Sequence, residues 1–369
     1  MAKINVLVGL SGGIDSSLTM YLLKERGFNP IGVTMNFDNN IFSENIDIEK
    51  NMNTCLSKKN REAINEIRAL TDRFNVPFYE IDLSKEFSEF VLQYFKNEYL
   101  KGKTPNPCIM CNKKIKFDLL LQKAQDMGIS FDYFATGHYA KIEYDDKNGR
   151  YLLRKGIDPK KDQSYFLSLL SQDVLKKTIF PLGDWIKEDV RKKVYELNFF
   201  SYNKKESQDF YSGDLNKLFG LEDNLGGNIV NSNGKSLGLH NGLHNYTIGQ
   251  RRGINIAAGK PIYVTKIDKE ENIIVVGEES ELFSSRFKVT NFNWVSIPPQ
   301  NSPLKVNGRI RYRHKEAPCI ITPADENSII VEFVTPERAI TPGQIFVAYN
   351  NDVVVGGGFI NNGECKIEN

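Results

Sequence analysis

Two short segments of the sequence combine residue types that could take part in chemistry, and the first is SGGIDSS at residues 11–17. Its two glycines would let a phosphate approach the backbone, and a helix N-terminus after them would offer free N–H groups and a positive dipole. A capped strand-to-helix turn, with Asp15 or Ser16 as the N-cap, is the alternative, but the whole string is more specific than a glycine pair. We therefore predict a phosphate-binding loop. It is not a Walker-type loop, because the Lys of G-x-x-x-x-G-K-[ST] is absent.

The second segment places Cys108 and Cys111 three positions apart in the string NPCIMCN. A thiolate is a nucleophile and a metal ligand, and this spacing suits exchange between two thiols. The chain has five cysteines in 369 residues, which are too few and too unevenly spaced for a disulfide scaffold. Two unrelated loop cysteines are the alternative. We interpret Cys319 and Cys365 as structural or incidental thiols.

The elements that would position these segments alternate between strand and helix over the first two hundred residues. Apolar runs predict strands at residues 4–10, 30–35, 77–81 and 133–136, and helical spacing predicts helices at residues 18–27, 60–74 and 117–127. Such alternation is typical of a parallel sheet with helices on both faces. Ligands of these sheets bind at the carboxyl ends of the strands, and the segment at residues 11–17 directly follows the first of them.

The pattern changes after about residue 200, where glycine and asparagine accumulate and helical spacing fades. Short strands are predicted at residues 262–267, 273–276, 305–313, 329–333, 345–348 and 353–355. Their spacing indicates a small β-barrel or sandwich. We expect an N-terminal α/β domain at residues 1–204, a central connector domain at 205–282 and a C-terminal β-barrel at 283–369.

Composition excludes several classes of protein. Length predicts two or three domains, and 40% hydrophobic, 25% charged and 11% aromatic residues argue against a disordered chain. The mean hydropathy is −0.39, and no apolar run reaches the length of a membrane span. The N-terminus leads directly into a glycine-rich turn, so we interpret it as a first strand rather than a signal peptide. We expect a soluble, cytoplasmic protein with no membrane partner. The net charge of +2 neither demands nor excludes nucleic acid, and no oligomeric state is predicted.

Eight strings together carry a family resemblance. SGGIDSS resembles the pyrophosphate loop (PP-loop) of the N-type ATP pyrophosphatases, which have an adenine nucleotide alpha-hydrolase-like fold. The others follow in one order: TPNPCIMCNKKIKF (104–117), ATGHYA (135–140), KDQSYFL (161–167), FPLG (180–183), YTIGQRRGI (246–254), RIRYRHKEAPC (309–319) and TPGQ (341–344). All eight resemble the tRNA-specific 2-thiouridylases over nearly the whole chain. This family has a PP-loop domain, a central connector and a β-barrel.

The resemblance implies a set of site residues. ATP would be bound by Gly9, Leu10, Ser11, Gly12, Gly13, Ile14, Asp15, Ser16, Ser17 and Met35, with Gly137 beside the adenine. Transfer RNA would be contacted by His138, Lys161, Asp162, Gln163, Arg311, Tyr312 and Gln344, with Asn106, Pro107 and Cys108 facing the target base. Cys111 matches the nucleophilic cysteine of the family.

The implied reaction is ATP-dependent sulfur transfer. ATP would adenylate the C2 oxygen of a uridine, expected to be the tRNA wobble uridine, and sulfur would then replace it to give 2-thiouridine, AMP and pyrophosphate. We expect Mg²⁺, held partly by Asp15, to stabilise the departing charge. The sulfur would come from a persulfide carrier protein or from sulfide. Strand alternation predicts Arg309, Arg311 and Arg313 on one face, as a stripe that contacts phosphates.

Two positions depart from the usual family pattern, and both concern sulfur. Cys108 stands where the family usually has Asp, and Tyr211 stands where it usually has a second catalytic cysteine. A tyrosine cannot carry a persulfide. Cys55, Cys108 and Cys111 could instead ligate three irons of a [4Fe–4S] cluster, Cys108 and Cys111 could form a persulfide relay, or the three could bind zinc.

Two other functions remain alternatives. One is a PP-loop enzyme that acts on another RNA, another position or with another nucleophile, which the Tyr211 substitution motivates. The other is a catalytically retired RNA-binding homologue, against which stands the intact SGGIDSS loop.

Overall fold

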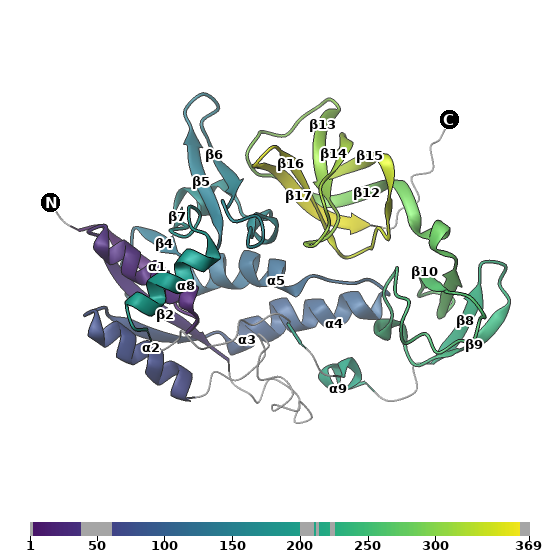
Figure 1. The fold of residues 1–369 in the computed structure, drawn as a ribbon, viewed down its shortest axis with the longest axis horizontal. Coiled ribbons are helices and arrows are strands. Elements are labelled where there is room, and N and C mark those ends of the chain that lie inside the picture. The colour runs from purple at the N-terminus through teal and green to yellow at the C-terminus, as the bar shows by residue number, and fades with distance from the viewer. Residues whose placement is uncertain (1–2, 38–60, 200–209, 212–213, 222–225, 362–369) are drawn as a thin grey trace.

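The computed structural model describes residues 3–37, 61–199, 210–211, 214–221 and 226–361, arranged in three parts (Figure 1). An N-terminal parallel sheet with helices is followed by a small central sheet, and a β-barrel comes last. This order confirms the predicted fold class. No helix among the described residues is long and apolar enough to span a membrane.

The N-terminal sheet has five parallel strands in the order β3-β2-β1-β4-β7. Their bounds are β1 Asn5–Gly9, β2 Asn29–Asn36, β3 Phe78–Asp82, β4 Tyr133–Ala135 and β7 Thr178–Ile179. The first four confirm the strands predicted from apolar runs, to within one residue at each end. The prediction missed β7, because a two-residue strand carries no pattern.

Helices cover both faces of this sheet. On one side lie α1 Ile14–Glu25, α2 Arg61–Arg73 and α8 Lys187–Glu196. Val6 and Val8 of β1 pack against them, whereas Leu7 packs on the opposite face. Successive side chains of a strand point to opposite faces, so one short apolar strand serves both hydrophobic layers.

Two helical segments lie between β3 and β4. The first comprises α3 Ser84–Phe87, η2 Ser88–Leu92 and α4 Gln93–Leu100, and the second comprises α5 Pro107–Met110, η3 Cys111–Leu119 and α6 Leu120–Asp126, with wider π-type turns in η2 and η3. The second, here named the thiol helix (residues 107–126), begins at Pro107 and not at Phe117 as predicted. Asn106 is extended (φ −114°, ψ 94°), and Pro107 suits the first helical position because it has no N–H to leave unpaired.

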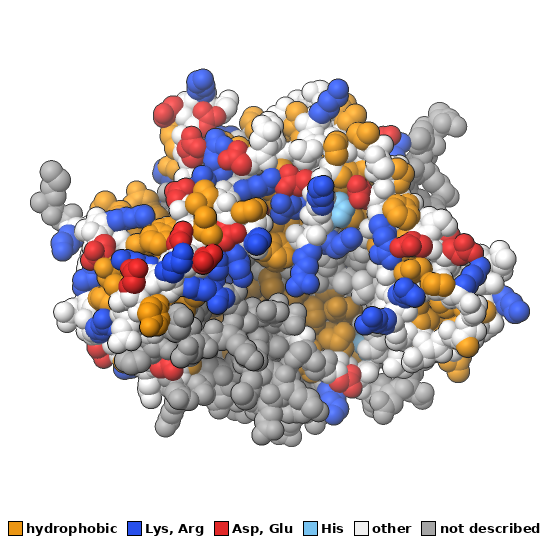
Figure 2. All heavy atoms as spheres, viewed as in Figure 1, with side chains coloured by type: hydrophobic (Ala, Val, Ile, Leu, Met, Phe, Trp, Pro, Cys, Tyr) orange, Lys and Arg blue, Asp and Glu red, His pale blue; other side chains and the backbone are white. Residues whose placement is uncertain are grey.

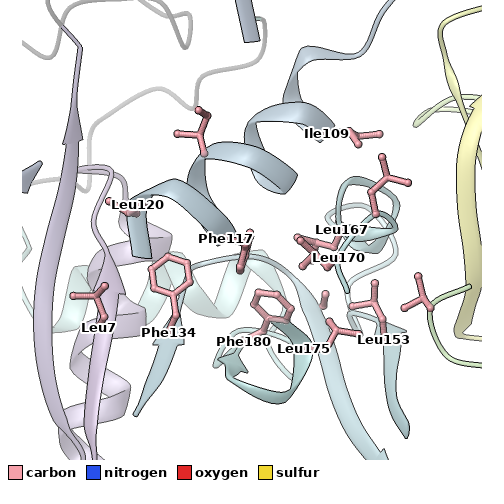
Figure 3. Close-up of a cluster of buried hydrophobic side chains, with 14 of the residues drawn as sticks. Leu7, Ile109, Phe117, Leu120, Phe134, Leu153, Leu167, Leu170, Leu175 and Phe180 are labelled. Atoms are coloured by element: carbon pink, nitrogen blue, oxygen red, sulfur yellow. The ribbon is translucent and has the colours of Figure 1, made fainter. Parts of the chain in front are cut away.

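Figure 3 shows how the thiol helix is fixed to the N-terminal domain. Its Phe117 ring centroid lies 5.3 Å from that of Phe134 on β4 and 6.1 Å from that of Phe180, and both pairs are nearly perpendicular. Ile109 is 1% exposed, and burial of such a side chain contributes about 1.5–3 kcal/mol. The turn that carries the two cysteines is therefore held by Ile109, one of the two hydrophobic residues between them.

The central part is a four-stranded sheet in the order β10-β11-β8-β9. Its strands are β8 Gly227–Asn231, β9 Ser236–His240, β10 Tyr263–Asp268 and β11 Ile273–Gly277, and α9 Leu215–Phe219 precedes them. Ile229, Val264 and Ile274 form the centre of its own hydrophobic core. The strands predicted at residues 262–267 and 273–276 are thereby confirmed.

The C-terminal part is a closed barrel, because β12 pairs with both β15 and β17. The strands follow the order β12-β15-β14-β13-β16-β17 and are β12 Phe283–Trp294, β13 Leu304–Arg309, β14 Ala317–Asp325, β15 Ser328–Arg338, β16 Ile345–Asn350 and β17 Val353–Asn361. A hairpin of the N-terminal domain, β5 Ala140–Asp145 and β6 Arg150–Lys155, extends this sheet through a pairing of Arg154 with Val353. The sequence did not predict this hairpin.

One strand prediction in the barrel is wrong. Strand β13 ends at Arg309 and not at residue 313, and the chain then turns, with the amide of His314 donating to the carbonyl oxygen of Arg311. Alternation therefore stops at Arg309, and the expected stripe of Arg309, Arg311 and Arg313 on one strand face does not exist. The remaining short elements are η4 Ser164–Leu167, α7 Gln172–Lys176, η6 Leu243–Asn245 and η7 Glu279–Leu282.

Candidate nucleotide and thiol site

The loop at residues 11–17 connects β1 to α1 and is braced by its own serines. The hydroxyls of Ser16 and Ser17 donate to the carbonyl oxygen of Gly13 over 3.1 and 3.0 Å, and the amide of Ser11 donates to the Ser16 hydroxyl oxygen over 3.1 Å. Gly12 has a φ of +80°, which a side chain would strain. The loop shape is thus built in before any ligand arrives, with the N-terminus of a 12-residue helix behind it.

The other predicted ATP-binding residues lie at the carboxyl ends of three adjacent strands. Gly9 ends β1, Leu10 follows it, and Met35 is the penultimate residue of β2. Gly137 comes just after β4, and a Cβ atom there would lie 2.9 Å from the Ser16 amide nitrogen and the Asp15 carbonyl carbon. Gly137 is therefore glycine because the turn after β4 packs directly on the loop.

Asp15 lies in the first turn of α1 and is held by two side chains from distant parts of the chain. The Lys187 ammonium donates to Oδ1 and Oδ2 of Asp15 over 2.8 and 2.7 Å, and the Tyr139 hydroxyl donates to Oδ1 over 2.6 Å. Only 8% of the Lys187 side chain is exposed, against 30% for Asp15. A buried cation is thus placed at the phosphate-binding loop.

Sequence reasoning missed Lys187, although a weak signal was present. Lys187 is the first residue of α8, where the positive end of the helix dipole disfavours a cation. Its own amide donates to Oδ2 of Asp158 over 2.9 Å, which fixes the start of the helix. A lysine at such a position, just after the FPLG string, indicates that its ammonium has an anionic partner elsewhere.

Both oxygens of the Asp15 carboxylate are engaged by donors of the protein, which disfavours Mg²⁺ at this carboxylate. Oδ1 accepts hydrogen bonds from Tyr139 and Lys187, and Oδ2 accepts one from Lys187. A divalent cation on Oδ2 would be repelled by the ammonium, by about 8 kcal/mol for charges of +2 and +1 about 4 Å apart near a protein surface. In the part of the chain that the structure describes, no three His, Cys, Asp or Glu side chains group to hold a metal ion. In this structure the Asp15 carboxylate holds the Lys187 ammonium.

The two cysteines lie on the first turns of the thiol helix, and both are partly exposed. Asn106 and Pro107, predicted to face the target base, form the start of the same helix. Cys55, the third predicted ligand of a cluster or of zinc, lies outside the described residues, as does Cys365. Cys319 is 2% exposed, and burial raises its pKa to about 12, which keeps it a protonated, unreactive thiol as predicted.

The GHYA and KDQ strings form one unit. The amide of Tyr139 donates to Oε1 of Gln163 over 3.0 Å, and the amide of Gln163 donates to the Tyr139 carbonyl oxygen over 2.9 Å. Nδ1 of His138 lies 2.7 Å from the Thr136 hydroxyl. Burial, and to a lesser degree the charge of Lys116, lowers the pKa of His138 well below its ordinary value, so this ring is neutral at pH 7. Lys161 is partly exposed on the adjoining turn.

Asp162 and Arg309 belong to a buried charge cluster at the junction with the barrel. Asp162 is 4% exposed and accepts hydrogen bonds from the amide and hydroxyl of Ser164. The Arg309 guanidinium lies 3.6 Å from Asp162 and 2.7 Å from Glu316. Burial raises the pKa of Asp162, while Ser164 and Arg309 oppose that shift. Both oxygens of this carboxylate are thus used inside the protein.

Arg311 and Tyr312 lie in the turn after β13. Nη1 of Arg311 donates to the carbonyl oxygens of Arg338 and Ala339 over 3.2 and 3.4 Å. The centroid of the Tyr312 ring lies 4.5 Å from that of Phe166, which belongs to the KDQSYFL string. The last predicted tRNA residue, Gln344, donates from Nε2 to the carbonyl oxygen of Thr104 over 2.9 Å. The structure thus brings most predicted tRNA residues to the boundary between the N-terminal domain and the barrel.

Figure 2 shows a hollow near the centre of one face, between the N-terminal sheet domain, the barrel and the central part. Lys and Arg side chains gather on its sides, and its floor is hydrophobic. Basic side chains around a hollow attract a polyanion even where the net charge is only +2, because the local field governs the approach.

Tyr211 packs against the same hydrophobic core as Cys111, and its hydroxyl donates to the carbonyl oxygen of Asp214 over 3.1 Å. We expect Tyr211→Phe to keep at least about half of the thiolation activity, because one exposed hydrogen bond contributes about 1 kcal/mol or less to stability. The measurement is the initial rate of 2-thiouridine formation with tRNA, beside the melting temperature. A loss of activity at unchanged melting temperature would show that the phenol takes part in the reaction.

Comparison with known proteins covers the chain almost completely. A tRNA methyl transferase HUP domain matches residues 4–211, a tRNA methyl transferase PRC-barrel domain matches residues 220–278 and an aminomethyltransferase β-barrel domain matches residues 284–360. The tRNA-specific 2-thiouridylase MnmA of Acetivibrio thermocellus is 42% identical over 98% of this chain and 100% of its own length. MnmA 2 of Thermoanaerobacter sp. (strain X514) is 43% identical over 96% and 97%, and MnmA of Endomicrobium trichonymphae is 41% identical over 97% and 99%. The chain belongs to the tRNA-specific 2-thiouridylase family.

Proposed function

We propose that this protein is an ATP-dependent tRNA-uridine 2-sulfurtransferase that makes 2-thiouridine at the wobble position. One observation carries the proposal. The braced phosphate loop and the cysteine-bearing thiol helix lie on one N-terminal domain, in a chain that matches 2-thiouridylases over its full length. Members of this family use ATP, and the loop of residues 11–17 is the part of this chain that would bind its phosphates.

The first half-reaction activates a poor leaving group. The C2 oxygen of the uridine attacks the α-phosphorus of ATP, the bond to the β-phosphate oxygen breaks, and pyrophosphate leaves. The loop amides and the Lys187 ammonium, held 2.7 Å from Asp15, are preorganised to stabilise the charge that develops on pyrophosphate. ATP enters as its Mg²⁺ complex, and no protein carboxylate is assigned to that ion.

In the second half-reaction a sulfur nucleophile attacks C2, the C2–O bond breaks, and AMP leaves. If that sulfur is the outer atom of a persulfide on Cys111, the Cys108 thiolate can then attack the inner sulfur. The S–S bond breaks, 2-thiouridine is released, and a Cys108–Cys111 disulfide remains for an external thiol to reduce. If the nucleophile is sulfide, no oxidation of the protein accompanies transfer. Tyr211 has no part in either route.

A [4Fe–4S] cluster is the competing sulfur carrier. Cys108 and Cys111 are one helical turn apart, and a third ligand would have to come from Cys55, which lies outside the described residues. The two routes differ in composition. A cluster predicts about four irons and four labile sulfides per protein after anaerobic purification. The relay predicts none, and it predicts a Cys108–Cys111 disulfide after one turnover.

We propose further that tRNA lies across the basic hollow, with its target base directed at Asn106, Pro107 and Cys108. Lys161, Tyr312 and His138 are all partly exposed, and His138 is a neutral ring because burial lowers its pKa. The sulfur donor would be a persulfide carrier protein or sulfide, and the setting for both would be the cytoplasm.

The decisive experiment is mass-spectrometric quantitation of 2-thiouridine after anaerobic incubation of the protein with MgATP, sulfide and unmodified tRNA. We expect product that requires ATP and appears with AMP in a 1:1 ratio. A matched tRNA with cytidine at the wobble position is the control. Product from neither tRNA, with pyrophosphate still exchanging into ATP, would reject the 2-thiouridine assignment and favour another RNA or nucleophile.

A further inference from the structure

The segment that leads into the thiol helix is clamped by all three parts of the molecule at one residue, Thr104. Its amide donates to the carbonyl oxygen of Pro342 over 2.8 Å, and its own carbonyl oxygen accepts from Nε2 of Gln344 over 2.9 Å. Its hydroxyl donates to the hydroxyl of Thr247, in the central part, over 3.2 Å. The main chain of Thr104 is thereby bonded to the barrel, and its side chain to the central part.

Packing around this clamp is close. Gly343 has a φ of +85°, and a Cβ atom there would lie 3.0 Å from Cβ of Lys103 and 3.1 Å from the Thr104 amide nitrogen. Such contacts are tighter than side chains normally allow, so only glycine lets the barrel loop lie on this segment. On the other side, Gly102 lies against Ile267 of β10.

The clamp is close in sequence to the thiols, and the connection is stiff. Only Pro105, Asn106 and Pro107 separate Thr104 from Cys108, and both prolines are buried. Proline fixes its own φ near −65° and restricts the residue before it. A displacement of Thr104 is therefore passed to Cys108 instead of being absorbed by backbone rotation.

The barrel side of the clamp is the loop of residues 339–344, here named the barrel loop. Arg311 donates to the carbonyl oxygens of Arg338 and Ala339 where this loop begins, and Gln344 ends it. Ala339 has a φ of +56°, and Gly249 of the central part packs closely on it. Arg311 and Gln344, two of the predicted tRNA residues, thus belong to or bond with the barrel loop. This loop in turn contacts Thr104, at the start of the segment predicted to face the base.

We propose that Gln344 is a positioning residue, which sets the place of Cys108 by holding Thr104 between the barrel loop and the central part. This inference rests on the proposed function, because it explains how tRNA bound to the barrel and the central part would be coupled to the cysteine-bearing segment. When tRNA binds to the barrel and the central part, residues 104–108 are then already in the position where the target base is expected. Gln344 acts through Thr104 and not through the RNA alone.

The test measures the reactivity of Cys108 without tRNA or ATP. Iodoacetamide alkylation, mapped by peptide mass spectrometry, is compared for wild type, Gln344→Leu and Thr247→Val. We expect Cys108 to react at least about threefold faster in both variants, because a released segment samples open conformations more often. Gln300→Leu is the matched control, since Gln300 also donates from its side-chain amide to a carbonyl oxygen, but to that of Pro298 in its own loop. It should leave the rate unchanged.

Cys319 reports in the same experiment on the integrity of the barrel, because it is buried in the barrel core. It should stay unreactive in all variants. If Cys319 also becomes reactive in Gln344→Leu, the barrel has opened in that variant. The inference is then tested by the Cys108 rate in Thr247→Val, which alters only the central side of the clamp. An unchanged Cys108 rate in Thr247→Val and in a folded Gln344→Leu would overturn the inference.

A second measurement separates positioning from RNA contact. At saturating tRNA, we expect Gln344→Leu to lower the single-turnover thiolation rate at least about tenfold, because small misplacements of reacting groups have large effects on rate. Its Kd for tRNA should change less than about threefold. A raised Kd with an unchanged saturating rate would make Gln344 a tRNA contact only. Absence of thiolation by the wild type would count against the proposed function. The alkylation rates would still test whether Gln344 positions Cys108, because that measurement needs neither tRNA nor ATP.

Discussion

Lys187→Met is expected to lower ATP-dependent adenylation about 10²- to 10³-fold, measured as exchange of labelled pyrophosphate into ATP in the presence of tRNA. Removal of one preorganised donor to a developing anion has an effect of this size. The change also removes the cation that balances the Asp15 carboxylate and leaves it the hydrogen bond from Tyr139, although only 30% of the Asp15 side chain is exposed. Methionine keeps the length of the aliphatic stem, so packing along α8 is preserved.

Lys192→Met is the matched control, because Lys192 lies on the same helix, is 65% exposed and pairs with the surface carboxylates of Glu188 and Asp189. Surface pairs of this kind contribute about 0–1 kcal/mol, so its exchange rate should equal that of the wild type. Full exchange activity in Lys187→Met would remove Lys187 from the adenylation step.

Asp15→Asn examines the same pair from the other side. We expect it to abolish exchange as well, because the amide cannot hold the Lys187 ammonium as the carboxylate does. Any residual activity should show the wild-type dependence on Mg²⁺ concentration, since the geometry assigns no cation to this carboxylate. A Mg²⁺ midpoint raised tenfold or more would show that Asp15 does bind the metal once ATP is present.

The second large effect concerns sulfur. Cys111→Ser should stop 2-thiouridine formation, by at least about 10³-fold, because a hydroxyl is a far weaker nucleophile and metal ligand than a thiolate at neutral pH. Pyrophosphate exchange should continue, since the loop of residues 11–17 lies on other elements of the domain. The measurement pairs quantitation of 2-thiouridine with the exchange assay on the same preparation.

Cys319→Ala serves as the control thiol, because Cys319 lies in the barrel core with a pKa raised to about 12. Its loss removes one buried sulfur and should leave both assays unchanged, with a lower melting temperature. Thiolation that persists in Cys111→Ser would remove Cys111 both as nucleophile and as ligand. Thiolation lost in Cys111→Ser together with bound iron would favour the cluster over the relay.

The sequence by itself determined the local features of this protein. The parallel sheet was predictable because each buried strand is a short apolar run, and the phosphate loop because two glycines and a helix start need no distant partner. The order of the eight strings indicated the family, which the full-length relatives confirm. Cys319 was interpreted as a structural or incidental thiol, and its burial in the barrel core favours the structural role.

Only the tertiary structure decided which side chains meet. Lys187 and Asp15 are 172 positions apart, and Gln344 and Thr104 are 240 apart, so no periodicity could pair them. Strand β13 was predicted four residues too long, because alternation of Arg309, Arg311 and Arg313 looks the same in a strand and in a turn. The spacing of hydrophobic residues predicts whether a segment forms a helix or a strand and which of its faces is buried. Ion pairs and contacts between domains join residues that are distant in the sequence. Which of these residues meet is determined by the packing of the whole molecule.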